Sequence, residues 1–182
     1  MHVSVVSIFG NHLSEIPALF SDLGYEVELP PKLLRKDELT SLRLLGTGEL
    51  HERIVYRAHS WTYIVDLDLE LMFDHEFWKT WSAKLHTSIV GWIAESDKVG
   101  YGFNVFYNGN LAREVLRHGN TLEEFGERLP IEYSIQWSNA REDQVLQTVS
   151  RIGAHYEYLK EDCEYFLYSM RDTDKGSVPV LQ

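Results

Sequence analysis

The spacing of hydrophobic and polar positions changes along the first part of the chain. Residues His2 to Phe9 are rich in β-branched side chains and alternate loosely, which predicts a strand. After Gly10, apolar residues recur every three or four positions, which is the spacing of one helix face. These residues are Leu13, Ile16, Phe20 and Leu23. A short strand is predicted next, from Tyr25 to Leu29, so we expect the chain to open with a β-α-β unit.

The middle of the chain combines strand and helix patterns. A short helix over Asp37 to Leu45 is followed by two predicted strands, from Leu50 to Arg57 and from Trp61 to Met72. Helical spacing of apolar residues then predicts one long amphipathic helix from about Asp74 to Ala94, with Asp74 as its N-cap. We expect three tryptophans on its apolar side to be buried at the centre of the core. They are Trp78, Trp81 and Trp92.

A β-hairpin is the strongest local prediction in the second half of the chain. Strand patterns run from Val99 to Tyr107 and from Leu111 to Arg117. The residues between them include Asn108 and Gly109, and this pair favours a type I′ turn because both central residues of that turn need a positive φ. The sequence therefore predicts two antiparallel strands joined at Asn108-Gly109.

The last predicted elements are a helix and a strand. Asn139 and Glu142 are spaced nearly as in a capping box, and apolar residues at helical spacing follow them. Gly153 is a candidate for the end of this helix. A final strand is predicted from Glu164 to Met170.

Together these elements predict an α+β fold: a single domain with a largely antiparallel sheet covered by two or three helices. We expect this domain to span residues 1–171 and a flexible C-terminal tail to span 172–182. The 182 residues, 44% of them hydrophobic and 25% charged, have the composition of a globular domain.

The charge and cysteine content narrow the classes of function. Asp and Glu outnumber Lys and Arg by 28 to 17, and the net charge of −11 argues against binding to nucleic acid or to an anionic membrane surface. Cys163 is the single cysteine, so no internal disulfide can form. The N-terminus lacks a basic segment, and every apolar run is shorter than the ~20 residues of a membrane helix. We therefore expect a cytoplasmic protein.

One run of acidic residues is the best candidate for catalytic chemistry. In a strand, Asp66, Asp68 and Glu70 would point to the same face, because side chains alternate between the two faces. Carboxylate oxygens are the ligands that Mg²⁺ and Mn²⁺ prefer, and His75 is the nearest imidazole that could join them. This interpretation makes the protein a divalent-metal-dependent hydrolase or transferase.

A second interpretation treats the same acidic residues as one side of a charged sheet surface, in which arginines on neighbouring strands pair with them. The candidate partners are Arg53, Arg57, Arg113 and Arg117. The sequence leaves open whether these arginines pair with the acidic face. No nucleophile or phosphate-loop motif is present, so we expect neither catalysis nor a cofactor.

The composition favours a non-catalytic module that binds a basic protein. An acidic surface captures a basic partner quickly through electrostatic steering. In composition the chain resembles small inhibitors of nucleases, such as the immunity proteins of bacterial toxin systems. A small-ligand sensor with an aromatic pocket is the other alternative, because 13% of the residues are aromatic. The oligomeric state is left open.

Overall fold

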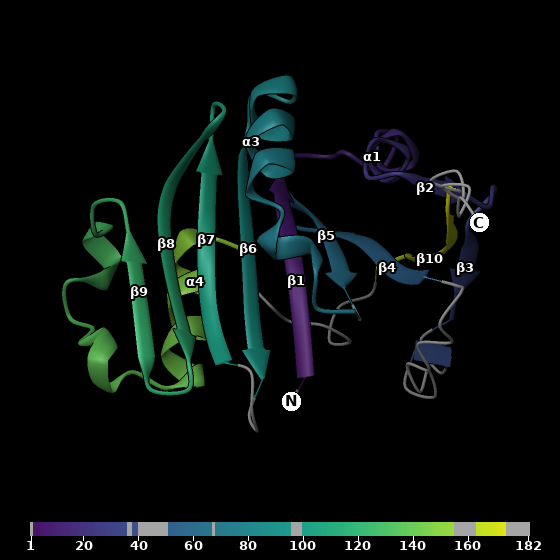
Figure 1. Cartoon of the computed structure of the whole chain (residues 1–182). Helices are drawn as coiled ribbons and strands as arrows, with labels where there is room; N and C mark the ends of the chain where they lie inside the picture. Colours follow the sequence, from purple (N-terminus) through teal and green to yellow (C-terminus); the bar gives the residue numbers. More distant parts are fainter. Residues whose placement is uncertain are drawn as a thin grey trace, which may run out of the picture.

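Among the residues that the structure describes, ten strands form one antiparallel sheet at the centre of the protein (Figure 1). The computed structural model describes residues 2–35, 38–39, 51–66, 68–95, 100–154 and 163–173. The strands are β1 (His2–Phe9), β2 (Tyr25–Val27), β3 (Lys32–Leu34), β4 (His51–Ala58), β5 (Trp61–Asp66), β6 (Ser88–Glu95), β7 (Gly100–Tyr107), β8 (Asn110–His118), β9 (Thr121–Phe125) and β10 (Tyr165–Asp172). Their order is β2-β10-β4-β5-β1-β6-β7-β8-β9, and β3 also pairs with β10. The predicted α+β class with an antiparallel sheet is confirmed.

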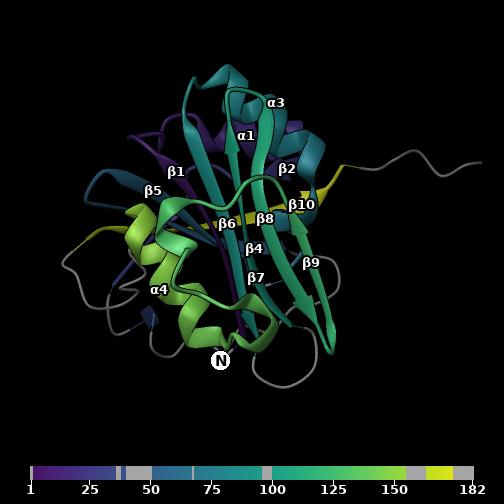
Figure 2. The same cartoon turned by 90° about the vertical axis from the view of Figure 1, so that its left-hand side faces the viewer.

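Helical segments pack on both faces of this sheet. They are α1 (Ile16–Asp22), the 3₁₀ turn η1 (Leu71–Phe73), α3 (His75–Lys84), the 3₁₀ turns η2 (Pro130–Glu132) and η3 (Trp137–Asn139), and α4 (Glu142–Ile152). Residues of α1, η1 and α3 share one buried apolar cluster with one face of the sheet. Residues of η3 and α4 share a second cluster with the other face. Figure 2, viewed from the β9 side, shows α4 on its own side of the sheet. No helix among the described residues has the length and apolar character to cross a membrane.

The first three elements follow the predicted order of strand, helix and strand, as β1, α1 and β2. The two strands are not neighbours, because β5, β4 and β10 lie between them in the sheet. The chain therefore crosses half of the sheet between β1 and β2. This crossing places β2 beside β10, the last strand of the chain that the structure describes.

The prediction of one helix from Asp74 to Ala94 is wrong in its second half. Helix α3 begins after Asp74, whose side chain accepts a hydrogen bond from the Phe77 backbone N–H as predicted for an N-cap. The helix ends at Lys84, and the chain then turns at His86, which has a φ of 50°. The following residues form β6, a central strand between β1 and β7.

The burial of the three tryptophans is confirmed, but their arrangement differs from the prediction. Trp78 and Trp81 lie in the cluster under α3, whereas Trp92 lies in the cluster on the opposite face of the sheet. The β6 segment is buried on both faces, so its apolar residues are nearly continuous. Such a run matches helical spacing by chance, because any spacing finds an apolar residue in it.

The predicted strand from Trp61 to Met72 is also too long. Strand β5 ends at Asp66, and η1 begins five residues later. The reason is local: the Asp66 carboxylate accepts hydrogen bonds from three backbone N–H groups that follow it, and this turns the chain away from the sheet. Leu69, within this turn, has a φ of 61°.

Several smaller predictions are confirmed. The hairpin of β7 and β8 turns at Asn108 and Gly109, with φ values of 47° and 82°. Gly153 ends α4 in a left-handed conformation. Helix α4 begins at Glu142, three residues after Asn139, which the sequence indicated as its cap. The Gln144 side chain accepts a hydrogen bond from the backbone N–H of Arg141, the residue before the helix. The predicted helix over Asp37 to Leu45 lies outside the described residues except at 38–39, and so does the predicted tail beyond residue 173.

Candidate functional site

Asp66 and Asp68 meet a buried arginine on the sheet face that carries α1 and α3. Arg53 of β4 is fully buried, and its Nε lies 2.9 Å from Asp66 Oδ1 while its Nη1 donates to Asp68 Oδ2 at 2.7 Å. Arg53 and Asp66 are direct register partners of β4 and β5. One of the four candidate arginines thus pairs with two of the three acidic residues. We call Arg53, Asp66, Asp68 and His51 the Arg53 cluster.

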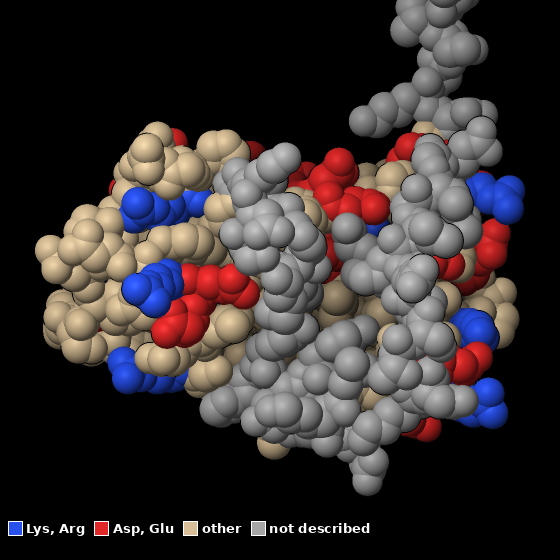
Figure 3. All heavy atoms as spheres, turned by 90° about the horizontal axis from the view of Figure 1, so that it is seen from below, with Lys and Arg blue, Asp and Glu red and all other residues tan. Residues whose placement is uncertain are grey.

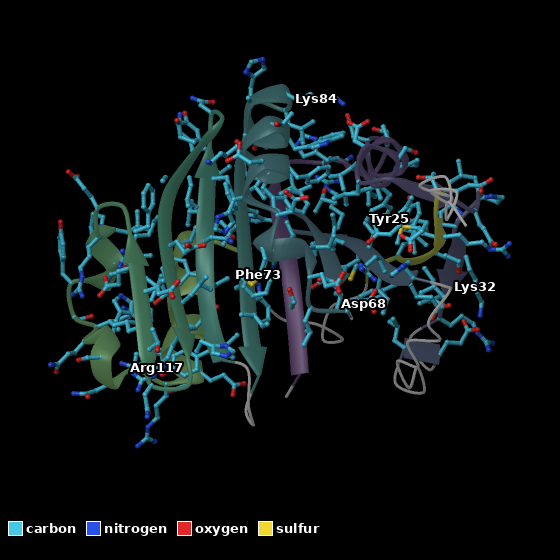
Figure 4. The ribbon with its side chains drawn as sticks, viewed as in Figure 1. Tyr25, Lys32, Asp68, Phe73, Lys84 and Arg117 are labelled. Atoms are coloured by element: carbon cyan, nitrogen blue, oxygen red, sulfur yellow. The ribbon has the colours of Figure 1, made fainter. Side chains whose placement is uncertain are left out.

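His51 connects this cluster to the end of β10. Its Nδ1 lies 2.8 Å from Asp68 Oδ2, and its Nε2 lies 3.5 Å from Asp172 Oδ2. The ring of Tyr25 packs against it, with the ring centroids 5.0 Å apart. Figure 4 shows Tyr25 and Asp68 in the same region of the molecule, near β10 and β4. The contacts of His51 therefore join β2, β4, β10 and the turn after β5.

The pKa values of Asp66 and Asp68 are shifted in opposite directions, because burial outweighs the opposing groups at the first and the hydrogen bonds together outweigh burial at the second. Burial raises the pKa of Asp66, and the Arg53 guanidinium and three backbone N–H donors oppose that shift without cancelling it. Burial also acts to raise the pKa of Asp68, but hydrogen bonds from His51 and Arg53 outweigh it, so this pKa is lowered. The pKa of the Tyr25 hydroxyl is raised, chiefly by burial. The cluster therefore holds two carboxyl groups whose pKa values are shifted in opposite directions.

The remaining metal-ligand candidates are not brought together. The Glu70 side chain is exposed, and only its backbone N–H contacts Asp66. His75 lies in the first turn of α3 with its Nε2 2.8 Å from Glu114 Oε2 of β8. Among the described residues, no group of three or more His, Cys, Asp or Glu side chains has the geometry to hold a metal ion.

The other candidate arginines lie elsewhere. Arg113 of β8 is buried and pairs with Glu132 of η2, and its Nη2 lies 2.7 Å from a carboxylate oxygen of that residue. Arg57 is exposed opposite Thr62. Arg113 therefore fixes η2 to the sheet rather than balancing the acidic residues after β5.

A groove opens on the sheet face that carries η1 and α3. Four residues form one row across strands β6 to β9, each paired in register with the next. They are Ile93, Gly102, Leu116 and Glu123. A pocket of about 100 Å³ lies on this row. It is lined by Ile93, Leu116 and Glu123 of the row, and by Gly100, His118 and Phe73, the last residue of η1. We call this pocket and its rim the β6–β9 groove.

Two glycines of β7 keep this part of the sheet free of side chains. Gly100 and Gly102 stand on the groove face, and a Cβ on either would lie less than 2.5 Å from a backbone oxygen of β8. The helix α3 packs at the other end of β7 and β8, where the Gly109 backbone N–H donates to the Ser82 hydroxyl, so it does not fill this space. Figure 4 shows Phe73 in front of the sheet at β6, beside the uncovered strands.

The groove combines exposed aromatic rings with Arg117, His118 and Glu123, and Glu123 is the single acidic residue among the described residues that line it. Phe73 is 45% exposed, and Phe125, two positions after Glu123 on the same face of β9, is 55% exposed. Glu123 has no ion-pair partner among the described residues. The guanidinium of Arg117, also at the pocket, donates instead to the carbonyls of Gly119 and Ser138, and Ser138 belongs to η3 on the opposite face.

Sequence reasoning did not predict this groove, although one of its lining residues, Arg117, was a candidate partner of the acidic run. Phe73 lay between the predicted strand from Trp61 to Met72 and the predicted helix from Asp74, and no strand was predicted over Thr121 to Phe125. The available signal was the two-residue turn Gly119-Asn120 directly after a predicted strand, which is typical of a hairpin. The groove itself also depends on the distance between η1 and β9, which no local pattern encodes.

Comparison with known proteins adds no relative. No family model matches the chain, no curated protein matches it, and no solved structure matches it.

Proposed function

We propose that this protein is a non-catalytic module that binds a basic protein, as a small protein inhibitor does, and that the β6–β9 groove is its contact site. The observation that carries the proposal is Glu123, an exposed carboxylate with no cationic partner among the described residues, beside the exposed rings of Phe73 and Phe125. Interfaces are enriched in aromatic residues, and their central contacts fill small pockets. A lysine or arginine side chain has an apolar stem for the groove and a cation for Glu123.

The size of the pocket supports a protein partner over a small ligand. Its volume of about 100 Å³ is well below the ~300–1,000 Å³ of typical small-molecule sites. A single side chain of a partner fits such a volume. The proposal therefore favours a protein-binding module over a sensor of small molecules.

The overall charge also supports a basic partner. The net charge of −11 attracts a cationic protein over a distance and increases its association rate. On the face seen from below, acidic and basic residues lie intermixed over the described surface (Figure 3). Discrimination between partners therefore depends on local groups such as Glu123 rather than on a uniform acidic field.

Selection from a random decapeptide display library tests the proposal. We expect the wild-type chain to enrich peptides in which Lys or Arg lies next to apolar residues. The Glu123→Lys variant should lose this enrichment, and the matched Glu127→Lys variant, which changes a nearby exposed glutamate, should keep it. Equal thermal unfolding of the three proteins establishes that they are folded. Wild-type selection without enrichment of basic residues contradicts the proposal.

A further inference from the structure

Strand β9 forms one end of the sheet, with β8 as its only partner among the described strands. A two-residue turn, Gly119 and Asn120, joins β8 to β9. The residues on either side of this turn, His118 and Thr121, are register partners. In a two-residue hairpin this first pair is hydrogen-bonded, and the following pairs alternate. The backbone N–H and C=O groups of Leu122 and Glu124 therefore point away from β8, towards an unoccupied position in the sheet.

The side chains of β9 indicate which kind of strand fits this position. Glu123 and Phe125 stand on the groove face, and Glu124 on the other face already pairs with Arg113 and Arg128. An added strand would place alternate side chains beside Glu123 and Phe125. A basic side chain opposite Glu123 is favourable, whereas a second copy of β9 would bring Glu123 near its own equivalent.

We propose that an extended, lysine- or arginine-bearing segment of the partner adds to the sheet as a strand beside β9, with its cationic side chain directed to Glu123. Edge-strand addition obtains its affinity from backbone hydrogen bonds and its specificity from pockets for alternate side chains. The β6–β9 groove supplies such a pocket next to the free edge. This inference rests on the proposed function, because it specifies how the basic partner binds.

The probe is an acetylated and amidated octapeptide of alternating valine and lysine, titrated into the full chain by calorimetry. Two N-methylated forms of the peptide carry the methyl groups either on all valines or on all lysines. In an added strand, alternate N–H groups face the sheet and the others face solvent. We therefore expect one methylated form to bind as the parent does and the other to lose all measurable binding. Glu123→Gln should weaken the parent by about fivefold, the upper range for a cross-strand pair, and Glu127→Gln should not.

Amide hydrogen exchange identifies the strand that is used. Addition of the parent peptide should change the amides of Leu122 and Glu124 from unprotected to protected, because these two face the free edge, whereas the amide of Glu123 is already hydrogen-bonded to β8 in the free protein. Equal binding of both methylated peptides overturns strand addition, while Lys and Arg enrichment in the decapeptide selection still upholds the proposed function. Protection of Leu122 and Glu124 that increases with protein concentration alone shows that a second copy occupies the edge, and also overturns the inference.

Discussion

Asp66 and Asp68 are two residues apart, yet their surroundings give them different roles. Asp66 is fully buried and caps the turn after β5, and burial raises its pKa. Asp68 is partly exposed, and its hydrogen bonds to His51 and Arg53 outweigh burial and lower its pKa. A lowered carboxyl pKa means that the folded protein favours the ionised form, so this ionisation stabilises the fold.

The Asp68→Asn substitution should reduce the dependence of stability on acid. In the wild type, the contribution of Asp68 is complete above its unfolded pKa of about 3.9 and is lost as the pH falls through its lower folded pKa. The variant should therefore be less stable than the wild type at pH 7, and the difference should narrow as the pH falls below 4. Urea unfolding at a series of pH values measures this difference. A gap that stays constant down to pH 2 would show that the ionisation of Asp68 does not contribute.

Part of the Arg53 cluster could be predicted from the sequence. Arg53 was a candidate partner of the acidic run because β4 and β5 were both predicted, and register then determines which residues stand opposite each other. Glu70 could not be placed correctly, because the turn capped by Asp66 breaks the alternation on which its position depended. His51 and Asp172 are brought together only by the pairing of β10 with β4, which joins distant parts of the chain.

At the scale of elements, one carboxylate fixes the segment that contains η2 and η3. Glu132 is buried and accepts hydrogen bonds from Arg113, from the Trp137 indole at 2.9 Å and from the Leu129 backbone at 3.0 Å. The segment contains short 3₁₀ turns and has few backbone hydrogen bonds to the sheet. Its position therefore depends on this side-chain network.

The Glu132→Ala substitution should destabilise the protein by about 3–5 kcal/mol, the cost of leaving one partner of a buried ion pair uncompensated. Arg113 would then lose its buried partner. The free energy of unfolding in urea measures the effect. The matched control is Glu124→Ala, which removes a more exposed partner of the same arginine and should cost no more than about 1 kcal/mol. Similar losses in both variants would contradict a special role for the buried pair.

The boundaries of the elements show where periodicity works and where it fails. The β7–β8 hairpin was predictable because its turn depends on two adjacent residues with positive φ. The division between α3 and β6 was not, because a strand buried on both faces has no polar side to interrupt an apolar run. No local pattern predicted that one face of β9 would lie in a groove, because this depends on which part of the sheet the rest of the fold leaves uncovered.

At the scale of the whole molecule, burial changes across the width of the sheet. The central strands β5, β1 and β6 have neighbours on both sides and buried residues on both faces. At the β9 end, one face is uncovered and most residues are exposed. A region with few buried apolar contacts opens locally at low cost, whereas a central strand becomes accessible only when the whole domain unfolds.

Native-state hydrogen exchange should separate these two parts of the sheet. The slowest amides of β1 and β6 should exchange with an opening free energy equal to that of global unfolding, and this energy should fall with added urea at the global rate. The hydrogen-bonded amides of β9 should exchange with a smaller opening energy that is nearly independent of urea, because local opening exposes little new surface. If the β9 amides instead followed the global curve, the edge would be an integral part of the core. The partner strand would then add to a rigid template, and its binding would slow the exchange of β8 and of the central strands alike, because a ligand of the native state stabilises it against global unfolding.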